Sequence, residues 1–165
     1  MATNLQFIKQ VSGSGVSSLS VTDCFSANYD VYKITGLFTV SVSGYHNFRL
    51  IYSGGTDSSS TYDNAFLMMK MYDSFIEERQ TGQNAINRSQ YFGTQQDFVM
   101  YVFNPNDSSS YTFFTNQGGG TLGSSTNLGA KFIGVHKEAQ QNTGLEFSTS
   151  SGTVTGKINV YGVKG

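Results

Sequence analysis

The sequence predicts an all-β protein that folds as an antiparallel β-sandwich, with a jelly roll as the leading topology. One observation is the segment from Asp97 to Phe114, where two aromatic-rich runs flank a polar turn that holds the chain's only proline. Aromatic and β-branched residues suit half-buried strands, whereas Asn, Asp, Ser and Pro close turns, so this segment predicts a β-hairpin. A second observation is that similar runs recur along the chain between short polar breaks. The length of 165 residues fits a single domain, 1–165.

Candidate strands follow one another along the whole chain. In order they are residues 5–8, 16–25, 32–42, 46–52, 62–72, 97–103, 111–114, 128–136, 144–148 and 154–163. Within 32–42, apolar and polar residues alternate around Gly36-Leu37, which predicts one buried face and a β-bulge at that pair. The run 46–52 follows closely in sequence and is predicted to be the hairpin partner of 32–42.

Two segments are less regular. Residues 62–72 contain helix-forming residues, but they lack a polar face of helical period and are bounded by serines, so a strand is predicted. Residues 77–96 are polar without an apolar period, which predicts a long loop with one short strand at Tyr91-Phe92. Loops of this length are uncommon in compact domains unless they contact a partner or carry function.

Composition excludes several classes of function. A net charge of -1, with 13% charged residues, provides no basic surface for nucleic acid. No run approaches the ~20 apolar residues of a membrane-spanning helix, and the first residues do not resemble an export signal, so we expect a protein made in the cytoplasm without export and without a membrane partner. Cys24 is the single cysteine, and its apolar neighbourhood predicts an inert buried thiol.

The sequence contains no motif that predicts catalysis, a cofactor or a metal. Gly118 to Gly123 matches G-x-G-x-x-G, but no helix or βαβ pattern follows, so a flexible loop is predicted. His46, His136 and Cys24 are too few to predict a zinc site, and each histidine is expected in a partly buried strand. The neighbours Glu77 and Glu78 would point to opposite faces of a strand, unlike a glycosidase pair. The protein is therefore predicted not to be an enzyme.

Exposed tyrosines give one alternative. Tyr45, Tyr62, Tyr91 and Tyr111 all lie near predicted loops, where aromatic rings can stack on sugars. Tyrosines at strand ends also pack at the rim of a sandwich or against a neighbouring subunit, and this second interpretation is favoured here. Glycan binding at these four residues stays open as the alternative.

Six blocks of sequence carry a resemblance to a known group of proteins. They are residues 4–8, 21–25, 29–34, 48–50, 102–107 and 160–164. In this order, and with the ending Tyr161-Gly162-Val163-Lys164, they resemble small virion proteins of tailed phages that infect marine bacteria and cyanobacteria. The resemblance spans nearly the whole chain. It departs from the pattern after Phe114, where the loop before the glycine run is shorter.

The resemblance implies a jelly-roll structural protein on the outer surface of the phage particle. The implied function is capsid decoration, as a cement protein that binds the major capsid protein or other virion proteins, or alternatively a tail appendage that binds a host glycan or receptor. A homo-oligomer is expected, with a trimer favoured. Partner contacts are predicted at the start of the chain and in the long polar loop, at Leu5, Phe7, Ile8, Phe75, Ile86 and Tyr91.

Overall fold

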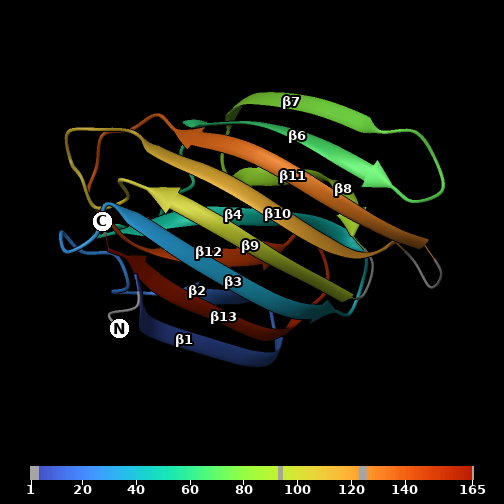
Figure 1. Cartoon of the computed structure of the whole chain (residues 1–165), viewed down its shortest axis with the longest axis horizontal. Helices are drawn as coiled ribbons and strands as arrows, with labels where there is room; N and C mark the ends of the chain where they lie inside the picture. The colour runs from blue at the N-terminus through green and yellow to red at the C-terminus, as the bar shows by residue number, and fades with distance from the viewer. Residues whose placement is uncertain (1–3, 93–94, 123–125, 165) are drawn as a thin grey trace.

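The computed structural model describes residues 4–92, 95–122 and 126–164, which form strands joined by turns (Figure 1). The strands are β1 (Leu5–Val16), β2 (Ser18–Val21), β3 (Val31–Val40), β4 (Gly44–Tyr52), β5 (Gly55–Thr56), β6 (Tyr62–Lys70), β7 (Ile76–Gln83), β8 (Ile86–Phe92), β9 (Gln95–Phe103), β10 (Thr112–Leu122), β11 (Thr126–His136), β12 (Asn142–Thr149) and β13 (Val154–Val163). Among these described residues no helix is long and apolar enough to cross a membrane.

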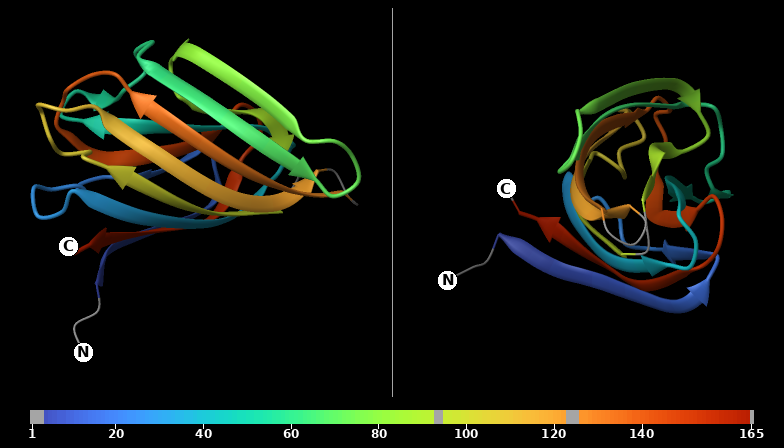
Figure 2. Two further views of the ribbon diagram at one scale, coloured as in Figure 1. Left: turned by 45° about the horizontal axis from the view of Figure 1, so that its top comes forward. Right: turned by 90° about the vertical axis from the view of Figure 1, so that its right-hand side faces the viewer.

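Two antiparallel sheets pack face to face, as the sequence predicts. The larger sheet has the order β1-β13-β3-β9-β10-β11-β6-β7, and the smaller has the order β2-β12-β4-β5, with β8 also paired to β4. The chain crosses repeatedly from one sheet to the other, as in a jelly-roll sandwich. The larger sheet curves around the smaller one, so its outward face is convex (Figure 2).

The core lies between the sheets and is rich in phenylalanine. In β9, Phe98 and Met100 point inward and are buried, while Val99 and Tyr101 point outward. The rings of Phe38 in β3 and Phe147 in β12 stack with centroids 4.3 Å apart and so join the two sheets. Aromatic pairs of this kind contribute about 0.5–1.5 kcal/mol beyond their burial.

Several predicted elements are confirmed. β9 and β10 form the predicted hairpin, with Phe103 opposite Phe113. In its turn Asn104 adopts a left-handed conformation, which Asn tolerates better than most residues. Within the predicted strand 62–72, residues 62–70 form the strand β6 rather than a helix, and the predicted strand 154–163 matches β13.

Two predictions about pairing near residue 36 are wrong. β3 and β4 do not form a hairpin, because β3 lies in the larger sheet and β4 in the smaller. No bulge occurs at Gly36-Leu37, since the register of β3 runs without a shift against both β9 and β13. Gly36 serves a different purpose: a Cβ there would collide with the rings of Phe98 and Phe38, so the missing side chain makes room for the core.

Two predicted loops are strands. Most of the predicted loop at 77–96 forms β7 and β8; β7 is an edge strand, and its polar residues can therefore face solvent. The glycines Gly118 to Gly120 belong to β10, where β9 and β11 pair with them on both sides. Backbone hydrogen bonds from two neighbours hold this glycine run in an extended conformation despite its weak strand propensity.

Candidate functional site

The outward face of the larger sheet carries an exposed band of apolar side chains. Cross-strand register aligns Phe7 with Tyr161 at one edge, and Tyr101, Thr115 and Ile133 across the centre, with Lys33 of β3 between the two groups. A neighbouring row aligns Phe103, Phe113 and Val135. We call this band the outer stripe and define it as Leu5, Phe7, Tyr101, Phe113, Ile133, Val135 and Tyr161.

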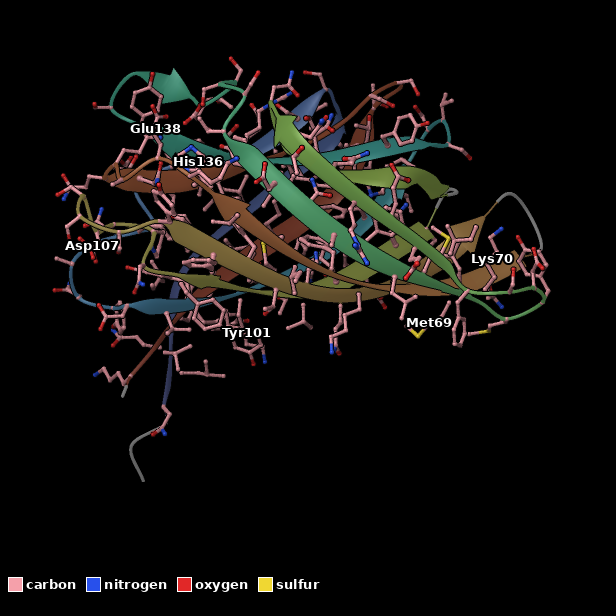
Figure 3. The ribbon with its side chains drawn as sticks, turned by 90° about the horizontal axis from the view of Figure 1, so that it is seen from above. Met69, Lys70, Tyr101, Asp107, His136 and Glu138 are labelled. Atoms are coloured by element: carbon pink, nitrogen blue, oxygen red, sulfur yellow. The ribbon has the colours of Figure 1, made fainter. Side chains whose placement is uncertain are left out.

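The outer stripe is well exposed in the isolated chain. Relative exposure is 57% for Phe7, 49% for Phe113 and 56% for Ile133. Figure 3 shows Tyr101 and, further along the sheet, Met69 pointing away from the sandwich on the same side. Single exposed apolar residues are ordinary, but a connected band of large ones marks an interaction surface.

An apolar groove of about 490 Å³ lies within the outer stripe. Phe113, Ile133 and Val135 line it, and the small side chain of Ala65 forms part of its floor. At its rim Asp63 accepts a 2.8 Å ion pair from Lys137, and this hydrogen-bonded partner lowers the pKa of Asp63. The groove is therefore mainly apolar, with Asp63 and Arg79 as its charged lining residues, and it suits an apolar side chain from a partner.

The predicted partner residues divide into three groups. Leu5 and Phe7 are exposed and belong to the outer stripe, whereas Ile8 is half-buried. Phe75 is 68% exposed but precedes β7, at the opposite edge of the sheet from β1. Ile86 is buried, so the prediction of a surface contact is wrong for it; its side chain completes the core instead. The side chain of Tyr91 lies outside the described part of the structure.

The four tyrosines of the glycan alternative also separate. Tyr45 and Tyr111 are exposed, as that alternative requires. Tyr62 is buried at the start of β6, where its hydroxyl oxygen accepts a 3.0 Å hydrogen bond from the backbone N–H of Leu50, and burial raises its pKa. A sugar contact at Tyr62 is thus excluded for the folded chain, and the side chain of Tyr91 lies beyond the described atoms.

Tyr45 borders a second, polar groove of about 510 Å³. Its other described walls include Asn47 and Arg49 of β4 and Glu78 and Gln80 of β7. The Nε2 atom of Gln80 donates a 2.8 Å hydrogen bond to Glu78. An aromatic ring beside amide, carboxylate and guanidinium groups provides both a stacking surface and hydrogen-bonding groups for a hydroxylated ligand.

A buried polar cluster closes one end of the sandwich. Nε2 of His136 lies 2.8 Å from Oδ2 of Asp57, to which Nε2 of Gln140 also donates at 2.7 Å. The hydroxyl and backbone N–H of Ser59 both donate to the other carboxylate oxygen. Burial would raise the pKa of Asp57, but the hydrogen bonds from Ser59 and the contact with His136 outweigh it, so the pKa is lowered. Figure 3 shows His136 with Glu138 near this end.

The cluster includes the one group among the described residues with the composition of a metal site. Nε2 of His136 and carboxylate oxygens of Asp57 and Glu138 lie within 4.8 Å of one another. Both oxygens of Asp57 already accept hydrogen bonds, and Glu138 is exposed, so these contacts hold the loops together. Nδ1 of His136 is buried without a hydrogen-bond partner among the described residues. The order also differs from a catalytic triad, because the Ser59 hydroxyl faces Asp57 rather than His136.

Comparison with known proteins adds little to this geometry. No family model and no curated protein matches the chain. Among solved structures, the Caenorhabditis elegans galectin LEC-6 is 10% identical, covers 96% of this chain and 95% of its own, and has a TM-score of 0.40. A human SPRY domain is 8% identical, covers 93% and 96%, and has a TM-score of 0.23. Similarity this low says nothing about ligand or partner.

Sequence reasoning missed the centre of the outer stripe. Tyr101, Phe113 and Ile133 were predicted as strand residues but not as surface residues, because each has an apolar or aromatic neighbour in sequence, such as Phe114 beside Phe113 and Phe132 beside Ile133. The available signal was the absence of helices: with no third layer to cover the larger sheet, its second apolar face must be exposed.

Proposed function

We propose that this protein is a non-enzymatic structural component of a phage particle, acting as a capsid decoration protein that binds the capsid lattice through the outer stripe. The observation that carries the proposal is the outer stripe itself, a mainly apolar band on a face of the larger sheet that no other layer of the described residues covers. The proposed location, the outer surface of a phage particle, rests on the sequence resemblance to phage virion proteins.

The mechanism is the burial of apolar area at many identical contacts. A stable interface removes about 1,200–2,000 Å² in total from solvent, and its energy concentrates in a few aromatic or aliphatic anchors. Phe113 and Ile133 flank the apolar groove and are the natural anchors. On a lattice, several such contacts engage at once, and linkage of this kind raises overall binding by roughly 10²–10⁴-fold.

The absence of an enzymatic role is part of this proposal. The nearest arrangement to a catalytic centre among the described residues is the cluster around His136. Its histidine is buried, and its carboxylate is occupied by Ser59 and Gln140. Such a cluster holds loops together and leaves no exposed nucleophile.

Immunogold electron microscopy of purified particles, with antibody against the recombinant chain, tests the location. We expect label over the head. Label confined to the tail would move the protein to an appendage, and no label on particles whose known surface proteins are detected would overturn the virion assignment.

Rebinding tests the surface. Particles lacking the protein are mixed with the wild type, with the double variant Phe113→Asp and Ile133→Asp, or with Val42→Asp as the control. Val42 is 51% exposed and lies in the turn after β3, outside the outer stripe. We expect the double variant to lose binding and Val42→Asp to retain it. Equal binding by all three folded proteins would contradict the role of the outer stripe.

A second candidate function is binding of a host-surface glycan by a tail appendage. The polar groove beside Tyr45 is the observation that favours it, since an exposed ring lies next to several hydrogen-bonding side chains. Enrichment on a glycan array that is lost in Tyr45→Ala, and retained in Tyr111→Ala, would support binding in this groove. No enrichment, or equal loss in both variants, would count against it.

A further inference from the structure

The two edges of the larger sheet are chemically different. β1 and β7 are the edge strands, and nothing in the described chain pairs with their outer sides (Figure 1). An edge strand presents unpaired N–H and C=O groups, and proteins protect such edges with charges, bulges or short length. β7 has eight residues and carries Glu77, Glu78 and Arg79 in succession. It is therefore a protected edge.

β1 carries less charge, although its register against β13 shifts at two places. It has 12 residues, and its single charged residue is Lys9. Lys9 lies opposite Val160, which is buried, and its Nζ donates a 2.6 Å hydrogen bond to the carbonyl oxygen of Thr22. The charge of Lys9 is thus directed to the inner side of the sheet and engaged there. The outward positions Gln10 and Ser12 are neutral and exposed.

The register of β1 defines where a second strand can pair. Shifts at Ile8 and after Gly13 leave two regular runs, Leu5 to Phe7 and the longer Lys9 to Gly13, whose middle residue is Val11. Strand pairing needs a regular run, because each bulge displaces the ladder of hydrogen bonds. A pair of β1 strands is therefore centred near Val11, with Gln10 of one copy opposite Ser12 of the other.

We propose that β1 pairs antiparallel with β1 of a second copy of this chain, which joins two larger sheets into one continuous sheet. A two-fold axis perpendicular to the sheet puts the outward faces of both copies on the same side of the joined sheet, with the two outer stripes at opposite ends of the paired β1 strands. In this register Phe7 of each copy lies over the glycine-rich stretch from Gly13 to Gly15 of the other, which offers little side chain to obstruct its ring. The pairing does not depend on a virion role.

Hydrogen exchange of the wild-type chain tests the proposal without any variant. Mass is measured by light scattering over a range of concentrations, and amide exchange is compared below and above the association midpoint. We expect a dimer and concentration-dependent protection in Leu5–Val16, with unchanged exchange in Ile76–Gln83. A monomer at the highest soluble concentration, a trimer, or protection in Ile76–Gln83 would overturn the pairing.

Charge at the edge provides the second test. Gln10→Lys with Ser12→Lys places like charges opposite each other in the dimer, and we expect its dissociation constant to rise about tenfold or more. The control is Gln95→Lys with Gln117→Lys, which adds the same charge to exposed positions of the inner strands β9 and β10. An equal rise of the dissociation constant in both double variants would refute pairing through the β1 edge. If the chain is a dimer but immunogold finds none of it on particles, only the proposed virion role is refuted. If the chain is a monomer and is found on particles, only the β1 pairing is refuted.

Discussion

Nε2 of His136 lies 2.8 Å from Oδ2 of Asp57, although the two residues are far apart in sequence and both side chains are buried. Asp57 directly follows β5, and His136 is the last residue of β11. Gln140, in the connection to β12, donates to the same carboxylate oxygen. The carboxylate of Asp57 therefore joins the end of β11, the connection after β5 and the connection between β11 and β12.

Asp57→Ala is expected to lower the free energy of unfolding by about 3 kcal/mol, because it leaves the buried His136 and the half-buried Ser59 and Gln140 without their acceptor. Urea denaturation followed by fluorescence or circular dichroism measures this. Asp107→Ala is the control, since Asp107 caps an exposed turn through Ser109 and Ser110. An equal or greater loss in Asp107→Ala would contradict the structural role of the buried cluster.

The contribution of Asp57 depends on pH in a definite direction. Its folded pKa is lower than its usual 3.8, so the folded state binds the proton less readily than the unfolded state. The stabilisation is complete above the unfolded pKa and is lost as the pH falls through the folded pKa. We expect the stability difference between wild type and Asp57→Asn to be constant near neutrality and to shrink below about pH 4. A difference that grew on acidification would have the wrong sign.

Two glycines in paired strands should respond oppositely to a methyl group. A Cβ at Gly144 would collide with the carbonyl oxygen of Val21, so Gly144→Ala is expected to cost about 2–3 kcal/mol. At Gly119 the nearest atom, Oδ1 of Asp97, would be 3.5 Å from the new methyl. Gly119→Ala should then be neutral or stabilise by up to about 1 kcal/mol, because glycine weakens strands. Thermal unfolding of both variants decides this, and similar losses would contradict the packing at Gly144.

The thiol of Cys24 should be unreactive in the folded protein. Burial raises its pKa to about 12, and Sγ donates a hydrogen bond to the carbonyl oxygen of Val21. The thiolate is the reacting species, so modification by a disulfide reagent near neutral pH should proceed only through opening of the structure. The rate should rise sharply across the urea transition. Rapid reaction in the absence of urea would show that this part of the core is open.

Local sequence pattern predicted strands well and their partners poorly. The run 154–163 has clear alternation, with Ile158 and Val160 buried and Lys157 exposed, and it forms β13 as expected. The run 46–52 alternates equally well, but alternation does not say which sheet a strand joins. β4 pairs with β12, nearly a hundred residues further along the chain. Such distant pairing depends on packing of the whole core, which no local window contains.

Sequence pattern also failed to predict polar strands. Of the inward positions of β7, Ile76 packs against the core, but Glu78 and Gln80 line the polar groove, so no apolar period reveals the strand. The sequence likewise identified only part of the outer stripe, because local pattern does not show which side of a sheet a residue faces. Leu5 and Phe7 stand out as apolar residues in a polar neighbourhood, whereas Tyr101 and Phe113 are hidden among apolar neighbours and only the fold shows which side they face.

The position of β13 between β1 and β3 affects how this chain can be made. β1 has its ladder partner only in β13, and the backbone N–H of Lys164 donates to the carbonyl oxygen of Asn4. β1 therefore leaves the ribosome well before its partner strand and can dock only after β13 is synthesised, so this sheet is completed only after synthesis of Val163. During that interval both edges of the nascent β1 are unpaired. Mispairing of β1 with a neighbouring chain is therefore favoured during translation, when nascent chains are close together.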